Sequence, residues 1–184
     1  YADLLREDGE ELSTLYSDLL IGVTRFFRDP DLFGALTDKV LPDFIARREA
    51  VGHHARADSV RDDAAIRVWI AGCSTGEEAY SFAICLLELL EAHSLDTPIQ
   101  IFATDLNAAA IAAARTGMYT RGIEADVTPE RLSRFFRKED TGYCVTKAVR
   151  DCCVFAVQNI TADPPFSHLD IVSCRNVLIY LQPT

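Results

Sequence analysis

The segment Val68–Tyr80 constrains the fold of this chain more than any other part of its sequence. An apolar run leads into two glycines, Gly72 and Gly76, and two carboxylates, Glu77 and Glu78, open the next helical pattern. A buried strand followed by a glycine-rich turn and a helix is typical of a doubly wound α/β sheet. Such a turn usually offers backbone N–H groups and a positive helix end to a phosphate, which these carboxylates would repel. The segment therefore predicts a crevice for a cationic ligand.

Charge also distinguishes between the cofactors that such folds bind. S-adenosylmethionine (SAM) carries an ammonium and a sulfonium but no phosphate, so the two carboxylates favour it over a dinucleotide. The glycines also do not complete the G-x-G-x-x-G pattern of a dinucleotide-binding oxidoreductase. The alternative is that Glu77 and Glu78 only stabilise the first turn of a helix through its dipole.

A second acidic residue with a predicted role is Asp105, which ends the apolar strand pattern 99–104. It follows the glycines by roughly 30 residues, near the spacing at which a doubly wound fold places a ribose-binding carboxylate. We therefore expect Asp105 to bind ribose hydroxyls. The alternative is that Asp105 caps the alanine-rich helix that begins near Asn107.

Strands and helices alternate from Ile66 onward. The patterns predict a first strand from Ile66, helix 77–92, strand 99–104, helix 108–116 and a further strand at 169–174. This order predicts a parallel sheet with crossover helices. Arg175 and Asn176 follow the last of these strands, at the edge where open α/β sheets bind ligands.

We divide the chain into an N-terminal helical segment with a linker, 1–65, and a SAM-binding domain, 66–184. The N-terminal segment has an apolar stripe at helical spacing (Leu12, Leu15, Tyr16, Leu19 and Leu20) and a helix start at Asp29-Pro30. Pro42 predicts a break or second start in that helix, and 51–65 reads as a loop. A β insertion is expected at about 118–158, with a short helix from Thr128 and an antiparallel pair formed by 143–146 and 152–157.

Composition excludes several classes of function. The 184 residues are 49% hydrophobic and carry a net charge of −10, which argues against nucleic-acid binding. No apolar run is long enough to span a bilayer and the start does not resemble a signal peptide, so we expect a cytoplasmic protein without membrane insertion. The six cysteines lack C-x-x-C spacing and do not pair with histidines at ligand intervals, so we expect buried thiols and no metal site.

Five segments together resemble the chemotaxis-receptor methyltransferases, the CheR family. They span nearly the whole chain in the family's order: Thr24–Arg28, Ala71–Ser81, Ala103–Asp105, Gly117–Tyr119 and Ser173–Tyr180. The resemblance implies a SAM-dependent methyltransferase (Rossmann-like) doubly wound α/β sheet with N-terminal helices and a small antiparallel β insertion. The strands that such a sheet adds after Cys174 are expected to be missing from this sequence. Either the chain is a fragment of a longer protein, or another chain covers the open edge of strand 169–174.

The resemblance also implies an activity and partners. The activity is methyl transfer from SAM to glutamate carboxylates of chemotaxis-type receptors, which leaves methyl esters and S-adenosylhomocysteine (SAH). The partner is the cytoplasmic domain of a chemoreceptor or related sensory protein. The lead-in Leu19–Thr24 resembles CheR domains fused to a methylesterase, and the short turn at 138–143 predicts no tethering to a receptor tail. The alternative is a non-catalytic SAM-binding or scaffolding module of a multidomain signalling protein.

Carried over residue by residue, the family's cofactor contacts fall on Thr24, Arg28, Glu78, Asp105, Asn159, Ile160, Asn176 and Val177. The resemblance gives Glu78 the methionine end or its ammonium and Asp105 the ribose. It gives Asn159 and Ile160 the adenine edge, and Asn176 and the Val177 backbone the methionine moiety. The family position that often carries Asn is Gly22 here, so one side-chain contact is missing.

The candidate catalytic residues are Arg28 and Tyr180. The planar guanidinium of Arg28 can grip a carboxylate bidentately, and Tyr180 could line the substrate mouth. The alternatives are that Arg28 pairs with a neighbouring acid such as Asp29, that Asn159 is a turn residue, and that Tyr180 packs in the core. Phe26 and Phe27 are expected to be buried supports for Thr24 and Arg28.

Overall fold

The computed structural model describes residues 24–52 and 65–175. Its main sheet has four parallel strands in the order β6-β2-β1-β7, so the predicted parallel sheet is confirmed. The strands are β1 (Ile66–Ala71), β2 (Ile99–Asp105), β6 (Cys153–Val157) and β7 (Ile171–Cys174). Because all four run in the same direction, their carboxyl ends lie along one edge of the sheet.

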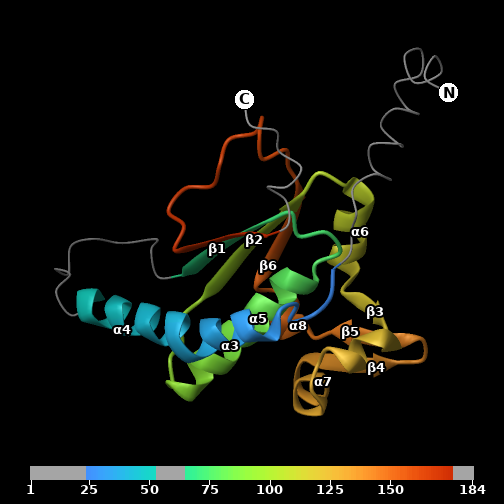
Figure 1. Ribbon diagram of the computed structural model, residues 1–184, viewed down its shortest axis with the longest axis horizontal. Coiled ribbons are helices and arrows are strands. Elements are labelled where there is room, and N and C mark those ends of the chain that lie inside the picture. The colour runs from blue at the N-terminus through green and yellow to red at the C-terminus, as the bar shows by residue number, and fades with distance from the viewer. Residues whose placement is uncertain (1–23, 53–64, 176–184) are drawn as a thin grey trace.

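Two crossover helices pack on one face of this sheet. Helix α5 (Glu77–Ala92) follows β1, and helix α6 (Ala108–Thr116) follows β2; both have the bounds that the sequence pattern predicts. They contact β2 and β6 (Figure 1). The buried core between helices and sheet includes Val68, Ile70, Ile101 and Ile84, which are at most 1% exposed. This packing fixes the glycine-rich turn between β1 and α5.

The N-terminal helices run as one continuous stretch. Helix α3 (Pro30–Ala35) passes into a π-helical turn, η1 (Leu36–Val40), and then into α4 (Leu41–Gly52). Pro42 therefore lies in the first turn of α4 and does not interrupt the stretch, and the helix continues two residues into the expected loop. The apolar stripe Leu12–Leu20 lies outside the described residues.

A second, antiparallel sheet forms the insertion, to one side of the main sheet in Figure 1. Its strands β3 (Met118–Thr120), β5 (Gly142–Val145) and β4 (Phe136–Glu139) lie in the order β3-β5-β4. Between them come a 3-10 turn, η3 (Arg121–Ala125), and helix α7 (Pro129–Phe135), which Thr128 caps.

The predicted pairing of 143–146 with 152–157 is wrong. β5 pairs with β3 and β4, whereas β6 pairs in parallel with β2 in the main sheet. A short helix, α8 (Lys147–Arg150), separates β5 from β6. The run Val-Phe-Ala-Val is apolar enough for either sheet, so local pattern could not choose its partner.

No helix in 24–52 or 65–175 has both the length and the apolar character that a membrane crossing requires.

Gly76 joins the turn to α5 in a backbone conformation that residues other than glycine rarely adopt, with φ 95°. A Cβ there would lie 3.0 Å from Cβ of Ala114 and 3.1 Å from the Phe155 ring. Gly76→Ala is therefore expected to lower the free energy of unfolding by about 3 kcal/mol, measured by urea denaturation. Gly34→Ala is the matched control, because its Cβ would meet nothing within 4 Å and its site is helical. It should raise stability by about 0.5 kcal/mol; equal effects of the two changes would contradict the account.

Candidate functional site

The turn after β1 brings backbone N–H groups and polar side chains to the carboxyl edge of the main sheet. Gly72, Ser74 and Gly76 all have positive φ, so the chain doubles back before α5 begins. The N–H groups of Gly72 and Cys73 donate to the Thr104 carbonyl oxygen at 2.7 and 2.9 Å. These bonds tie the turn of β1 to the end of β2.

Asp105 stands at the end of β2 and holds the same turn through its side chain. Its Oδ2 accepts from the Ser74 N–H at 2.8 Å, and its Oδ1 accepts from the Asn107 N–H at 2.9 Å. Asn107 caps α6, since its Oδ1 accepts from the N–H groups of Ala109 and Ala110. The alternative that Asp105 caps this helix is therefore wrong. A carboxylate oxygen has a second lone pair, so Asp105 keeps acceptor capacity for ligand hydroxyls.

Glu78 faces β7 and lies close to Arg175. Its Oε1 accepts from the Ser173 hydroxyl at 2.6 Å, and its Oε2 lies 3.6 Å from Arg175 Nη1. The side chains of Glu78 and Arg175 are 17% and 15% exposed. Arg175 therefore balances part of the Glu78 charge, which from the sequence alone was expected to be available to a ligand.

Arg175 connects three segments that are distant in sequence. Its Nη2 donates to the Arg28 carbonyl oxygen at 3.2 Å and forms an ion pair with Asp29. Asp29 occupies the N-cap position of α3, which confirms the predicted helix start at Asp29-Pro30, but its carboxylate makes no capping hydrogen bond and forms the ion pair instead. The sequence pattern predicted that Arg175 lies at the carboxyl edge of the sheet, but it could not predict these contacts.

The segment that carries Thr24 and Arg28 is fixed by its two phenylalanines. Phe26 is 1% and Phe27 8% exposed, which confirms them as buried supports. The Phe27 N–H donates to the Ser81 hydroxyl at 3.0 Å, and that hydroxyl donates to the Glu77 carbonyl oxygen at 2.7 Å. The backbone on both sides of Arg28 is thus anchored, to α5 on one side and to Arg175 on the other.

Asn159 and Ile160 follow β6, which pairs with β2 as far as Asp105 and Val157. The Asn159 Oδ1 accepts from the N–H and hydroxyl of Thr161 at 3.0 and 2.7 Å. Its own N–H donates to Asp163 Oδ2 at 2.7 Å. Asn159 is therefore a turn residue, as the alternative held, and it stands at the same edge of the sheet as Asp105.

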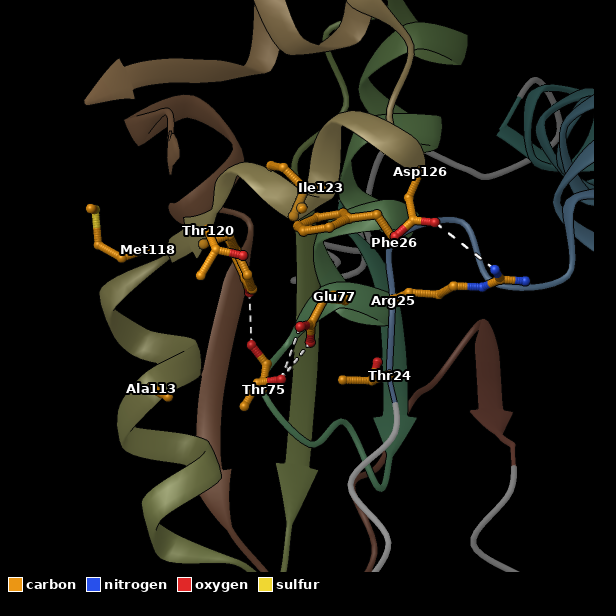
Figure 2. A pocket seen from close by; sticks show the side chains of 12 residues that line it. Thr24, Arg25, Phe26, Thr75, Glu77, Ala113, Met118, Thr120, Ile123 and Asp126 are labelled. Carbon is orange, nitrogen blue, oxygen red and sulfur yellow. Dashed lines mark hydrogen bonds and ion pairs between the residues drawn. The ribbon is translucent and has the colours of Figure 1, made fainter. Parts of the chain in front are cut away.

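Thr24 lines a cavity of about 350 Å³, beside Thr75 and Glu77 (Figure 2). The cavity is lined by residues 24–26, by Thr75 and Glu77, and by parts of 113–126. Burial raises the pKa of the Glu77 carboxyl, while hydrogen bonds from Thr75 and Thr24 act in the opposite direction. The structure thus brings Thr24 to Glu77, the carboxylate beside Glu78.

Three candidate residues, Asn176, Val177 and Tyr180, lie outside the described residues, as does Gly22. Within 24–52 and 65–175 no group of three or more His, Cys, Asp or Glu side chains could hold a metal ion. Four cysteines are buried, and burial raises the pKa of Cys85 to about 12. That thiol is a core residue rather than a nucleophile.

The described side chains fit SAM chemically. Arg175 Nη1 is buried and makes no hydrogen bond within the described part of the chain, so it is a donor that a ligand carboxylate could use. Asp105 offers acceptors for ribose hydroxyls, and Glu78 a negative charge for a cation. SAM has a carboxylate, ribose hydroxyls and cationic groups, and no phosphate that these acids would repel.

Residues 22–184 match the family described as CheR methyltransferase, SAM binding domain. An uncharacterised 104.1 kDa protein of Rhodobacter capsulatus is 40% identical over 183 residues, which are 100% of this chain and 18% of that protein. Chemotaxis protein methyltransferase 1 of Pseudomonas aeruginosa is 34% identical over 162 residues, 85% of this chain and 54% of that protein. Chemotaxis protein methyltransferase 2 of the same species is 33% identical over 192 residues, 100% of this chain and 61% of that protein.

This chain spans less than two thirds of each of these relatives. The family match nevertheless extends over nearly all of its length and includes every described residue. It confirms the resemblance and the SAM-dependent methyltransferase fold that the sequence segments indicated. The chain belongs to the CheR methyltransferase family, through its SAM-binding domain.

Proposed function

We propose that this domain transfers a methyl group from SAM to glutamate side chains of chemoreceptor cytoplasmic domains. The observation that carries the proposal is the meeting of Glu78, Arg175 and the Arg28 backbone at the sheet edge where Asp105 also ends its strand. Family membership and two relatives named chemotaxis protein methyltransferases support the choice of reaction and of acceptor.

The binding roles follow from position and chemistry. Asp105 would accept hydrogen bonds from the ribose hydroxyls, and Asn159 and Ile160 would contact the adenine edge beside it. Glu78 would attract the cationic methionine end, with Thr24 nearby. Asn176 and Val177 are proposed for the methionine moiety. Arg175 would bind the cofactor carboxylate through its Nη1, and its contacts with Glu78 and the Arg28 backbone would hold both of these groups in place.

The chemistry requires positioning rather than a strong base. When bound, SAM would supply a methyl group on a positively charged sulfur. An already ionised acceptor carboxylate would form a bond to that methyl carbon as the carbon–sulfur bond breaks, which leaves SAH and a methyl ester. Arg28 would hold the acceptor carboxylate through two parallel N–H bonds and limit its orientations. Tyr180 is proposed to line the mouth through which the acceptor enters. Exclusion of water would strengthen these electrostatic contacts.

The direct test is incubation of the protein with methyl-labelled SAM and receptor cytoplasmic domains. We expect base-labile label on the receptor, because a methyl ester hydrolyses in base whereas methyl groups on nitrogen do not. Receptor domains with the modified glutamates changed to alanine are the matched control and should take up no label. SAM binding without any base-labile label would instead support the non-catalytic module.

A further inference from the structure

The cavity beside Glu77 is separate from most of the proposed cofactor contacts. Thr24 is the one residue that lines the cavity and belongs to the proposed cofactor set within the described residues; Glu78, Asp105, Asn159 and Arg28 do not line it. The cavity is lined by residues 24–26, by Thr75 and Glu77, by Ala113 of α6 and by residues of the insertion between 118 and 126. The cavity therefore adjoins the cofactor crevice without coinciding with it.

Glu77 gives the cavity a negative charge that no described basic group neutralises directly. Both of its carboxylate oxygens accept from the Thr75 hydroxyl, at 3.0 and 2.7 Å. Asp126, across the cavity, raises the pKa of Glu77 further by repulsion. Arg25 also lines the cavity, but its guanidinium lies 4.0 Å from Asp126 and its side chain is 56% exposed. A ligand cation would relieve this repulsion, and an anion would add to it.

Apolar side chains line part of the remaining walls, beside the hydroxyl groups of Thr24 and Thr120, and the rim reaches solvent. Figure 2 shows Glu77 between Thr75 and the Phe26 ring, with Ile123 beside that ring. Met118, at the rim, is 43% exposed. A lysine or arginine side chain has a methylene stem and a charged head, which match apolar walls that lead to a carboxylate.

We propose that this cavity binds a basic side chain of the acceptor protein, close to the glutamate that is methylated. The proposal rests on the proposed function, because the acceptor is the protein that presents its glutamate to the adjoining crevice. The insertion would thereby take part in acceptor selection through residues 118–126. Acceptors with an acidic residue at that position would be disfavoured by Glu77 and Asp126.

The first test uses N-acetyl-lysine amide as the probe and N-acetyl-norleucine amide as its uncharged counterpart. Each is titrated by NMR into the full chain saturated with SAH. We expect the lysine probe to bind at least about tenfold more tightly than the norleucine probe. Glu77→Gln should remove that preference, whereas Glu139→Gln, outside the cavity, should keep it. Asp126→Asn should reduce the preference, which provides a second variant away from the glycine-rich turn.

Two results would overturn this inference: equal binding of both probes, or displacement of SAH by the lysine probe, which would make the cavity part of the cofactor crevice. The second test measures methyl transfer to a receptor cytoplasmic domain. Glu77→Gln should raise KM for the receptor at least about fivefold and leave kcat within twofold, and an unchanged KM would refute an acceptor role. Absence of transfer by the unmodified protein would instead refute the proposed function, so the two failures are distinguishable.

Discussion

Arg28→Ala is expected to lower kcat for methyl transfer at least about 100-fold, because a bidentate grip on a carboxylate contributes about 2.7 kcal/mol or more to positioning. The fold should persist, since the neighbouring backbone is anchored through Phe27, Ser81 and Arg175. The measurement is the rate of base-labile methylation of receptor domains under saturating SAM. Urea denaturation of the same variant checks that its stability is unchanged.

Two further variants sharpen that experiment. Arg28→Lys keeps the charge but lacks the planar fork, so it should recover only part of the rate. Arg47→Ala, on an exposed position of α4, removes an arginine elsewhere and should leave the rate unchanged. A rate for Arg28→Ala within threefold of the unmodified protein would remove Arg28 from the mechanism.

Asp105→Ala is expected to raise the Kd for SAH about 100-fold, measured by calorimetry. The change removes acceptors for the ribose hydroxyls and also frees the Ser74 and Asn107 N–H groups that Asp105 now binds. Hydrogen bonds to a charged group are each about 1.5–3 kcal/mol, so the loss of affinity should be large. Removal of the turn's anchor should also lower stability by about 1–3 kcal/mol.

A ligand change separates the two roles of Asp105. An SAH analogue without ribose hydroxyls should bind the unmodified protein far more weakly than SAH, but should bind Asp105→Ala about as well as SAH does. Asn107→Ala is the control for the helix cap: it should cost about 1 kcal/mol of stability and leave the Kd within threefold. If the hydroxyls matter equally in both proteins, Asp105 does not contact the ribose.

The sequence predicted those parts of the fold that depend on local pattern. Helices α5 and α6 have the predicted bounds because an acidic first turn and an alanine-rich run mark them clearly. The partner of β6 was predicted wrongly, because strand pairing depends on packing against β2, which is distant in sequence. Asp105 and Asn107 are both residue types that commonly cap a helix. Only their hydrogen bonds in the structure show that Asn107 caps α6 whereas Asp105 anchors the glycine-rich turn.

The sequence predicted where the candidate site lies and which residue types form it, but it did not predict the contacts between those residues. The glycine-rich turn and the strand ends pointed to the carboxyl edge of the sheet as the candidate site. Glu78, Asp105, Asn159 and the Arg28 backbone lie along that edge, with Thr24 in the adjoining cavity. The ion pair of Glu78 with Arg175 joins residues far apart in sequence, so no rule of sequence spacing could predict it. The different surroundings of Glu77 and Glu78 likewise required the three-dimensional arrangement, because in the sequence they are simply adjacent acids.

A crystal structure with SAH bound would show where on this domain the cofactor lies. We expect SAH at the carboxyl edge of the four parallel strands, with its ribose hydroxyls at Asp105 and its homocysteine end at Glu78 and Arg175. The same crystals soaked in NADH should show no pyrophosphate there. SAH elsewhere on the molecule, or a pyrophosphate at the turn between β1 and α5, would contradict the account.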